Sequence, residues 1–354
     1  MLSLGMAWFS TTRQRRADSA RRVPDAPARV TPEFACYLRP REATVATEVR
    51  DPLHGAIRVE AAELLLIDHP AFQRLRHVRQ LGFSEMSFPG ATHTRYLHSL
   101  GTMEVATRAY DAMFAHWIFA TPANRVAFRQ MVRLAALLHD LGHTPLSHAA
   151  EFAMPTVDGL ELPALLDRPS TRPDQVATHE DMTLKFLLAS SFRRALEEAF
   201  PFPAEAVAGL IDRELQVDPT LFVDGGQDYR PVLSQLVSSE LDADRMDYLA
   251  RDSYFSGVKY GNVDLAWLLR SMRPHAEGDR IHLALDGRAL YTLEHLLLAR
   301  YHMFLMVYFH YRSVAYEQLL REFLAEGGDG YAIPVDPDRY VEFDDAHLLG
   351  VLRR

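Results

Sequence analysis

An imidazole and a carboxylate stand side by side at His139 and Asp140, at the end of a largely apolar run over residues 131–138. The run predicts a buried helix. A charged pair at the end of such a helix is costly unless its members pair with each other or bind a metal ion. For an isolated His-Asp dipeptide both alternatives are open, and mutual pairing in a core is the more common one.

More titratable side chains follow directly. Gly142 ends the predicted helix, and the Thr-Pro pair at 144–145 is typical of the start of a second helix. We expect His143 in the elbow between the two helices. His148 and Glu151 are three residues apart, so they should share one face of the second helix.

Two other predicted helices carry candidate ligands. Arg95 and His98 are three residues apart and share a helical face, and Asp244, Tyr248 and Asp252 recur every four residues. Taken alone, a histidine on an apolar face is more often a packed core residue, and an acidic segment is more often a solvated surface.

Two imidazoles and two carboxylates from these helices form a candidate metal site: His98, His139, Asp140 and Asp244. This mixed set of ligands suits Mn, Fe, Mg or Zn and leaves room on the ion for water and substrate oxygens. Such an ion polarises phosphoryl oxygens and lowers the pKa of bound water, and Arg95 could clamp a phosphate with its planar guanidinium. The candidate acid–base groups around this site are His143, His148 and His179.

The elements that must position these groups are predicted mainly as helices. Apolar periodicity predicts a helix over 61–81 that is interrupted at Pro70, a helix from Thr92 or Thr94 to about residue 114, and a long helix over 288–325. Short strands are expected at 57–59 and 280–285. Thr178 is predicted to cap a further helix that begins at His179.

Composition narrows the class of protein. The chain is 48% hydrophobic and 24% charged, as globular proteins are, and its net charge of −9 argues against a protein that coats DNA. Its one cysteine, Cys36, excludes an internal disulfide framework and a cysteine-rich zinc site. No apolar run approaches the roughly 18 residues that span a bilayer, and the first residues lack the basic flank of a secretory signal. We therefore expect a cytoplasmic protein without membrane contact.

Six phrases of the sequence resemble a known family when they are taken together: RDPLHG (50–55), FQRLRHVRQLG (72–82), FPGATHTRYLHSLG (88–101), LLHDLGHTPLSH (137–148), THED (178–181) and LDADRMDYLARDS (241–253). In them the chain resembles the HD-domain phosphohydrolase superfamily, and within it the branch of dNTP triphosphohydrolases. The resemblance implies an all-α fold, with an HD-domain helical core, a small β element and a long C-terminal helix. It also implies that the four candidate ligands bind a divalent metal ion.

The resemblance assigns roles to single residues. Arg95 corresponds to a phosphate-binding arginine, and His148, supported by Glu151, corresponds to the catalytic histidine, with His143 and His179 as further active-site histidines. The remaining positions that match substrate-binding residues are Gln80, Leu81, Arg245, Tyr248, Asp252, Tyr308 and His310. Gln80 and Asp252 would hold the 3′-hydroxyl of the sugar. Tyr308 would pack against C2′ and exclude a ribose hydroxyl, provided that the pocket cannot relax.

The same resemblance bears on regulation and on the division of the chain. Asp68, Gln73 and Arg76 match positions that help a regulated relative to bind an activating guanine nucleotide between subunits, so we expect an activating nucleotide and a homo-oligomer, without a sterile-alpha-motif domain. Residues 1–45, which are rich in arginine, are expected to be a disordered basic tail. Residues 46–275 would form the HD core, and residues 276–354 a helical part that packs on it and completes the nucleotide pocket.

The implied function is metal-dependent hydrolysis of deoxynucleoside triphosphates to deoxynucleoside and tripolyphosphate. One alternative keeps the site and changes the substrate, giving an HD-type nucleotide phosphatase, or a phosphodiesterase or nuclease that the basic tail would suit. A second alternative is a non-catalytic nucleotide sensor. Nucleic acid is not the expected partner, because the chain as a whole is acidic.

Overall fold

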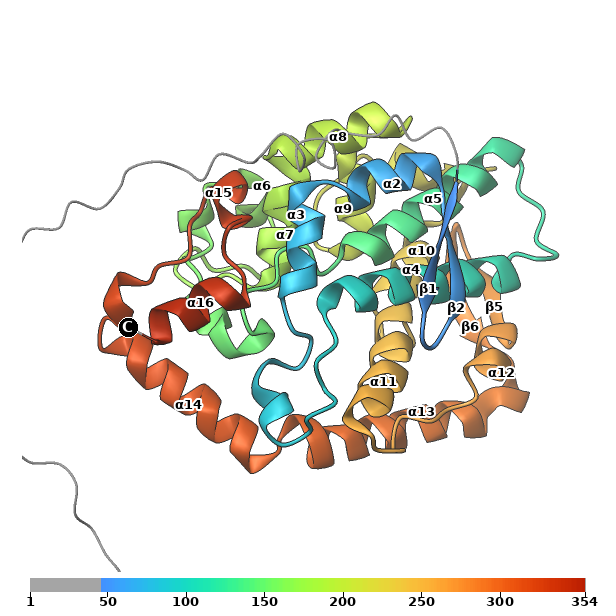
Figure 1. The fold of residues 1–354 in the computed structure, drawn as a ribbon. Helices are drawn as coiled ribbons and strands as arrows, with labels where there is room; N and C mark the ends of the chain where they lie inside the picture. Colours follow the sequence, from blue (N-terminus) through green and yellow to red (C-terminus); the bar gives the residue numbers. More distant parts are fainter. Residues whose placement is uncertain (1–45, 354) are drawn as a thin grey trace, which may run out of the picture. The chain divides into compact units, whose positions relative to one another are not determined.

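The structure is a computed structural model that describes residues 46–353. The tail expected over residues 1–45 lies outside the described residues. Two strands open the described chain, β1 (Thr47–Asp51) and β2 (Gly55–Val59), which confirms the strand expected at 57–59. They form an antiparallel hairpin in which Thr47 pairs with Val59 and Asp51 with Gly55. The hairpin is blue in Figure 1 and contacts helix α4.

Helices make up most of the remainder, which confirms the expected fold class. The helices of the first half are α2 (Ala61–Ile67), α3 (Pro70–Gln73), α4 (Arg95–Met113), α5 (Pro122–Leu138), α6 (Pro163–Leu166) and α7 (His179–Leu188), with the 3-10 turns η1 (Arg74–His77), η2 (Gly82–Met86), η3 (Ser147–Ala153) and η4 (Asp158–Leu160). The helices of the second half are α8 (Ser191–Ala199), α9 (Ala204–Ile211), η5 (Pro219–Phe222), α10 (Arg230–Val237), α11 (Ala243–Ser256), α12 (Leu265–Arg270), η6 (Gly287–Ala289), α13 (Leu290–Met303), α14 (Tyr311–Ala325), η8 (Gly328–Gly330), α15 (Pro337–Tyr340) and α16 (Asp345–Leu352).

The core is centred on α4 and α5, with α11 packed across α4 (Figure 1). Every residue from 131 to 138 is buried, which confirms the buried helix that the apolar run predicts. The run also contains Arg133, whose guanidinium donates to the buried carboxylate of Glu63 on α2 (2.6 and 2.8 Å). The pairing lets a charged residue stay inside the core.

The helix expected over 61–81, interrupted at Pro70, is confirmed as far as residue 73; a 3-10 turn follows over 74–77, and residues 78–81 are not helical. α2 ends at Ile67, and α3 begins at Pro70, where a proline is well suited to the first helical position. Helix α7 begins at His179 as expected, with Thr178 and Asp181 capping each other's backbone N–H groups.

The elbow after Asp140 differs from the expectation. Thr144 does not cap an α-helix: Leu146 and Ser147 both take left-handed φ values, 56° and 58°, and a 3-10 turn follows. Such a conformation costs roughly 1–2 kcal/mol for each L-residue. Distant contacts hold it, because the N–H of Leu146 donates to Asp345 of α16 (2.6 Å) and the hydroxyl of Ser147 donates to the carbonyl of Arg79 (2.5 Å).

The C-terminal helical stretch is confirmed, but it is not one continuous helix over 288–325. α13 passes into a π turn, η7 (Phe304–Tyr308), and α14 begins only at Tyr311. The two helices meet at an angle along the lower edge of Figure 1. No glycine or proline marks the break. It is stabilised instead by His310, whose Nδ1 lies 3.0 Å from the hydroxyl of Ser87 and also faces the N–H of Arg312.

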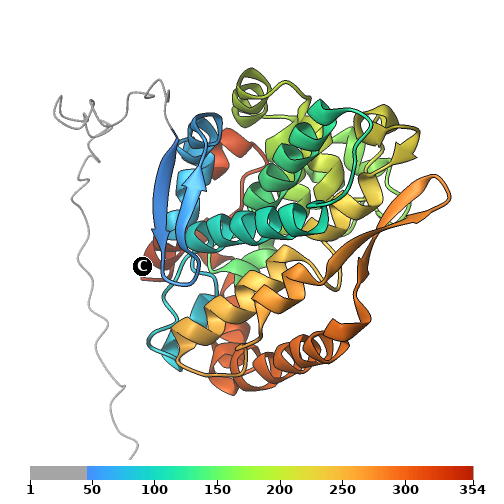
Figure 2. The same ribbon diagram turned by 90° about the vertical axis from the view of Figure 1, so that its right-hand side faces the viewer.

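A small sheet completes the described part of the chain. Its strands, in spatial order, are β3 (Val223–Asp224), β4 (Gln227–Asp228), β6 (Arg280–Leu285) and β5 (Met272–Glu277). The strand expected at 280–285 is confirmed, and the β5–β6 hairpin extends away from the helices in Figure 2. Within residues 46–353, no helix combines the length and the apolar character that crossing a lipid bilayer requires.

Candidate active site

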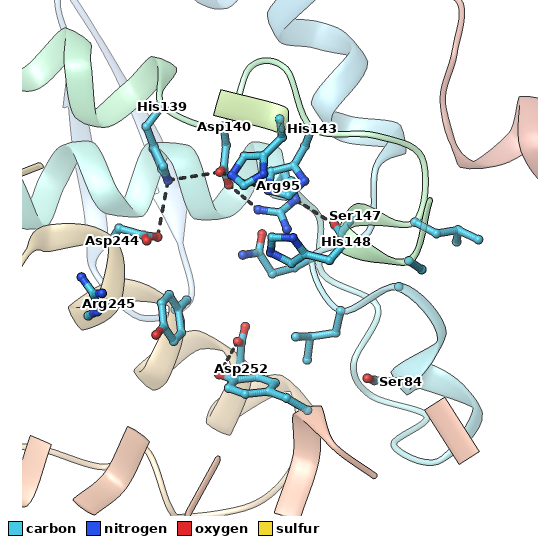
Figure 3. Close-up of a pocket in the computed structure, with 18 of the residues that line it drawn as sticks. Ser84, Arg95, His139, Asp140, His143, Ser147, His148, Asp244, Arg245 and Asp252 are labelled. Atoms are coloured by element: carbon cyan, nitrogen blue, oxygen red, sulfur yellow. Dashed lines mark hydrogen bonds and ion pairs between the residues drawn. The ribbon is translucent and has the colours of Figure 1, made fainter. Parts of the chain in front are cut away.

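Three helices bring the candidate metal ligands together. His98 lies on α4, His139 caps the C-terminus of α5 and precedes Asp140, and Asp244 lies in the first turn of α11. The Nε2 atom of His98 is 2.9 Å from Oδ1 of Asp244 and 3.6 Å from Oδ2 of Asp140. The Nε2 atom of His139 is 3.4 Å from Oδ1 of both carboxylates (Figure 3).

The two imidazoles of this cluster are oriented for metal binding. Nδ1 of His139 lies 2.8 Å from the carbonyl of Ala136, and Nδ1 of His98 lies 2.8 Å from the carboxylate of Asp247. Carbonyl and carboxylate oxygens only accept, so each Nδ1 carries the hydrogen. Both Nε2 atoms are buried, and although carboxylate oxygens lie 2.9–3.4 Å away, neither nitrogen makes a hydrogen bond of good geometry. Buried polar atoms normally have one, so these nitrogens and the two carboxylates fit a divalent metal ion.

Opposite charges dominate the electrostatics of the cluster. Burial lowers the pKa of His98, but its contacts with Asp244 and Asp247 outweigh burial and raise that pKa to about 10. Burial likewise raises the pKa of Asp140, yet Arg95 and the neighbouring imidazoles hold it well below its usual range. Asp140 is therefore ionised, as a metal ligand must be, and a metal ion competes with a proton for His98.

Arg95 stands in a fixed orientation beside the four candidate metal ligands, His98, His139, Asp140 and Asp244. Its Nη1 donates to Oδ2 of Asp140 (2.5 Å), and its Nε donates to the hydroxyl of Ser147 (2.8 Å), as Figure 3 shows. His143 lies on the other side of Asp140, with its Nε2 3.5 Å from Oδ1. Burial and the nearby guanidinium of Arg95 hold the pKa of His143 well below its usual value, so this imidazole is neutral.

A second group of imidazoles is joined by Glu151. Its Oε2 lies 2.9 Å from Nδ1 of His148, and its Oε1 lies 2.6 Å from Nδ1 of His179. Although burial raises the pKa of Glu151, these two contacts hold it far below 4.5, so the carboxylate stays ionised. His143 stacks on His179 with 3.7 Å between ring centroids, whereas the side chain of His148 is 66% exposed.

Gly142 allows the second group to approach the first. A Cβ atom at this position would collide with the backbone of α7, at His179 and Thr183. The N–H of Gly142 donates to the hydroxyl of Thr183 (2.9 Å), which in turn donates to the carbonyl of His139. The start of α7 is thereby fixed against the end of α5.

Helix α11 and the π turn η7 form one wall of a cavity that lies beside these imidazoles. The hydroxyl of Tyr308 donates to Oδ2 of Asp252 (2.7 Å), and the ring of Tyr248 stands edge-on to that of Tyr308. Oδ1 of Asp252 faces Nε2 of the buried His93 at 2.8 Å. The buried side chain of Gln80 has no partner for its Oε1. This end therefore offers aromatic faces and fixed polar atoms.

Most of the predicted site residues line one cavity of about 530 Å³: Gln80, Leu81, Arg95, His139, Asp140, His143, His148, His179, Asp244, Arg245, Tyr248, Asp252 and Tyr308. Glu151 and His98 contact that lining from behind. Part of the guanidinium of Arg245 is already hydrogen-bonded within the protein, because its Nη1 donates to Asp242 (2.5 Å). His310 lies outside the lining, at the break between α13 and α14.

The three residues expected to read an activating nucleotide lie on the surface, away from the cavity. Arg76 donates to the amide oxygen of Gln73 (2.7 Å), and its guanidinium stacks on the ring of Tyr96, 3.6 Å from the centroid. Asp68 is exposed at the C-terminus of α2.

Sequence reasoning assigned no role to several residues that the structure places at the site. Ser147 holds Arg95, His93 holds Asp252, and Asp247 holds His98. One signal was available for Asp247: it follows Asp244 by three residues on a helix, so it had to lie near the same face. His93 and Ser147 act across the fold, and their partners are 159 and 52 residues away in the chain.

Sequence comparisons identify a family model and several relatives that match this chain. A family model described as the HD domain matches residues 95–252. The uncharacterized protein YwfO of Bacillus subtilis is 33% identical over 277 residues, which are 78% of this chain and 54% of that protein. The deoxynucleoside triphosphate triphosphohydrolase SAMHD1 of Gallus gallus is 28% identical over 343 residues, which are 90% of this chain and 54% of that protein. The chain thus spans about half the length of the curated relatives it matches.

Two solved structures resemble the fold of this chain. A hypothetical protein from Aquifex aeolicus superposes with a TM-score of 0.66 and 30% identity, covering 88% of this chain and 72% of that one. A phosphohydrolase from Bacteroides thetaiotaomicron superposes with a TM-score of 0.67 and 26% identity, covering 87% of this chain and 72% of that one.

Proposed function

The chain belongs to the HD-domain phosphohydrolase family, and we propose that it hydrolyses deoxynucleoside triphosphates to deoxynucleoside and tripolyphosphate. The observation that carries the proposal is one cavity with the candidate metal ligands and an arginine at one end, and aromatic rings with a carboxylate at the other. Its volume lies within the range of small-molecule sites. The similarity to relatives named as deoxynucleoside triphosphate triphosphohydrolases supports the choice of substrate.

The triphosphate would lie at the end of the cavity that carries Arg95. A divalent cation bound there by His98, His139, Asp140 and Asp244 would polarise phosphoryl oxygens and offset developing charge. The guanidinium of Arg95 needs no reorganisation to assist, because Asp140 and Ser147 already hold it. Donors that are fixed in advance stabilise a transition state most effectively.

His148 would protonate the leaving group. Water adds to the α-phosphorus and releases one proton to solvent, the bond from that phosphorus to the 5′-oxygen breaks, and the 5′-oxygen takes the proton that His148 gives up. Glu151 faces Nδ1 of His148, which leaves Nε2 of this exposed imidazole free to carry the proton into the cavity. His179 shares the same carboxylate, and His143, which is neutral, would donate its single N–H near the phosphates.

The sugar would lie against α11 and the π turn. Asp252 and Gln80 would bind the 3′-hydroxyl, and the ring of Tyr308 would face C2′. The hydrogen bond from Tyr308 to Asp252 fixes that ring, so a ribose 2′-hydroxyl would meet a wall that does not move aside. Leu81, Tyr248 and Arg245 complete the proposed contacts. His310 would act indirectly, by holding the break that places Tyr308.

A panel of substrates tests the proposal. Purified protein, stripped with a chelator and reloaded with Mn²⁺ or Fe²⁺, is incubated with dNTPs, NTPs, dNMPs and single-stranded DNA. We expect tripolyphosphate and deoxynucleoside from dNTPs, and none from the chelated protein. Release of orthophosphate from dNMPs would instead indicate a phosphatase, shortened DNA would indicate a nuclease, and binding of dNTPs without turnover would indicate a sensor.

We further propose that the protein is a homo-oligomer that pairs through the outer face of α13 and α14. Ten large apolar side chains in this segment do not line the cavity and are 40–81% exposed: Leu290, Tyr291, Leu297, Leu298, Tyr301, Leu305, Met306, Tyr311, Tyr316 and Leu319. The four tyrosines alone, at roughly 60% of the 150–250 Å² that an aromatic side chain can bury, offer about 400–600 Å² per copy, and the six Leu and Met side chains add to that area. A standard interface buries about 800 Å² per partner.

Sedimentation tests this face. The double substitution Leu298→Glu and Tyr301→Glu should give monomers where the wild type forms dimers or larger assemblies.

The proposed activating nucleotide would bind at a separate site, formed by Asp68, Gln73 and Arg76, where exposed polar groups surround the Arg76 guanidinium that stacks on Tyr96. Substituting Arg76 by alanine should then remove activation by guanine nucleotides and leave basal turnover intact.

A further inference from the structure

We propose that the N-terminal hairpin positions the metal ligand His98 through a buried network of four residues, Asp51, His54, Asp247 and Arg251. The inference rests on the metal site of the proposed function. It gives a role to the phrase RDPLHG, which forms the turn between β1 and β2 and takes no part in lining the cavity.

Asp247 is the member of this network that contacts the ligand. Its Oδ2 accepts from Nδ1 of His98 at 2.8 Å. This bond fixes the rotation of the imidazole and leaves its Nε2 directed at Asp244 and Asp140, where the metal would lie. A carboxylate on the outer nitrogen of a metal-binding histidine is a recognised way to orient the ligand and to increase its basicity.

Asp247 is itself held from two sides. Arg251, one turn further along α11, donates to both of its oxygens (2.8 and 2.9 Å). His54, from the hairpin turn, approaches Oδ1 at 2.6 Å. Asp247 and Arg251 are fully buried, and the side chain of His54 is 5% exposed. The carboxylate therefore has one position, and water does not compete for it.

The hairpin turn is in turn built around Asp51. Its Oδ1 accepts from the backbone N–H groups of Leu53 and His54 (both 2.9 Å), which fixes the turn that presents the His54 ring. Its Oδ2 accepts from Nη1 of Arg251 at 2.8 Å. The turn thus supports Asp247 twice, directly through His54 and indirectly through Arg251.

Gly101 makes room for the network on α4. It lies one turn after His98, and a Cβ atom there would collide with the side chains of both Asp247 and Arg251. The absence of a side chain lets the carboxylate of α11 reach the ligand on α4. A network that served stability alone would need no such approach, and a buried ion pair is by itself weak evidence for stability.

Metal titration without any nucleotide tests the proposal. Binding of Mn²⁺ is measured by calorimetry for the wild type, Asp247→Asn, His54→Ala and His54→Gln. We expect the dissociation constant to rise about 10- to 100-fold in Asp247→Asn and about tenfold in His54→Ala. His54→Gln should recover most of the affinity, because its amide can donate to the same carboxylate oxygen. The electron paramagnetic resonance spectrum of bound Mn²⁺ should also change in Asp247→Asn.

Glu63→Gln is the matched control. Glu63 is an equally buried carboxylate that pairs with an arginine, and it contacts none of the proposed site residues. It should lower the melting temperature and leave the affinity for Mn²⁺ unchanged. Wild-type affinity in Asp247→Asn, or an equal loss in Glu63→Gln, would overturn the inference. If Asp247→Asn does not fold, the two His54 variants test the inference instead. Equal affinities of His54→Ala and His54→Gln for Mn²⁺ would then refute it.

The Mn²⁺ titration and the hydrolysis assay test different claims, so either proposal can fail while the other stands. Wild-type protein that binds Mn²⁺ but releases no tripolyphosphate would refute the substrate proposal, and the affinities of the variants would still decide on the network. The reverse result, normal hydrolysis by the wild type with no effect of Asp247→Asn on Mn²⁺ binding, would refute the network alone.

Discussion

The carboxylate of Glu151 contacts two imidazoles at once, and replacing it with glutamine removes its charge while keeping its size. Its two oxygens now serve His148 at 2.9 Å and His179 at 2.6 Å, and Oε1 also accepts the backbone N–H of His179 at 2.8 Å. The two rings contact different carboxylate oxygens, and an amide keeps an oxygen at only one of these positions, so it can accept from only one of the rings. Both the ring and the backbone N–H of His179 contact Oε1. We therefore expect the amide oxygen to stay with His179, and His148 to lose its hydrogen-bond acceptor.

The size of the effect follows from that lost contact. A hydrogen bond to a charged group contributes about 1.5–3 kcal/mol, and about 1.4 kcal/mol corresponds to a tenfold change in rate. If His148 is the proton donor, its protonated form loses this stabilisation in Glu151→Gln. We therefore expect kcat for dNTP hydrolysis to fall about 10- to 150-fold, with little change in KM, in steady-state assays that measure tripolyphosphate.

Glu151→Asp is the matched control, because it keeps the charge. It should retain much more of the activity than Glu151→Gln, and both variants should keep the melting temperature within a few degrees of the wild type. A kcat for Glu151→Gln within threefold of the wild type, in a folded and metal-loaded protein, would refute the role given to the Glu151–His148 pair.

Four further predictions concern pH, specificity, stability and metal. The folded protein depresses the pKa of Glu151 below 4.5, so its stabilising contribution is present above pH 4.5 and is lost as the pH falls further; urea unfolding should show the wild type losing its advantage over Glu151→Gln in that acidic range. Tyr308→Ala should raise kcat/KM for NTPs relative to dNTPs by about tenfold or more, since a small steric change in a pocket is worth about 1–3 kcal/mol. Glu63→Gln leaves the buried guanidinium of Arg133 without its counter-charge, so the free energy of unfolding in urea should fall by about 3 kcal/mol. Mn²⁺ at 100 times its dissociation constant should stabilise the chelated protein by about 2.7 kcal/mol, seen as a higher melting temperature that His139→Ala abolishes.

Local sequence patterns were sufficient where a single helix decides the geometry. The four-residue spacing of Asp244, Tyr248 and Asp252 placed all three on one side of α11, and the apolar run before His139 defined α5. The three-residue spacing of His148 and Glu151 also predicted their contact, even though the segment is a 3-10 turn and not an α-helix.

Local patterns were insufficient where distant residues impose the conformation. The left-handed pair Leu146–Ser147 depends on Asp345, about 200 residues later in the chain, and no local signal indicates it. The break at His310 occurs in a stretch without glycine or proline and depends on Ser87. Asp247 was visible as one acid among several, and only its distance to His98 gives it a role.

The position of bond cleavage tests the central claim most directly. Hydrolysis of a dNTP in ¹⁸O-labelled water is followed by mass spectrometry of both products. The account predicts one labelled oxygen in tripolyphosphate and none in the deoxynucleoside, because water adds to the α-phosphorus and the 5′-oxygen leaves with a proton. Labelled deoxynucleoside, or label in pyrophosphate, orthophosphate or a nucleotide, would contradict it.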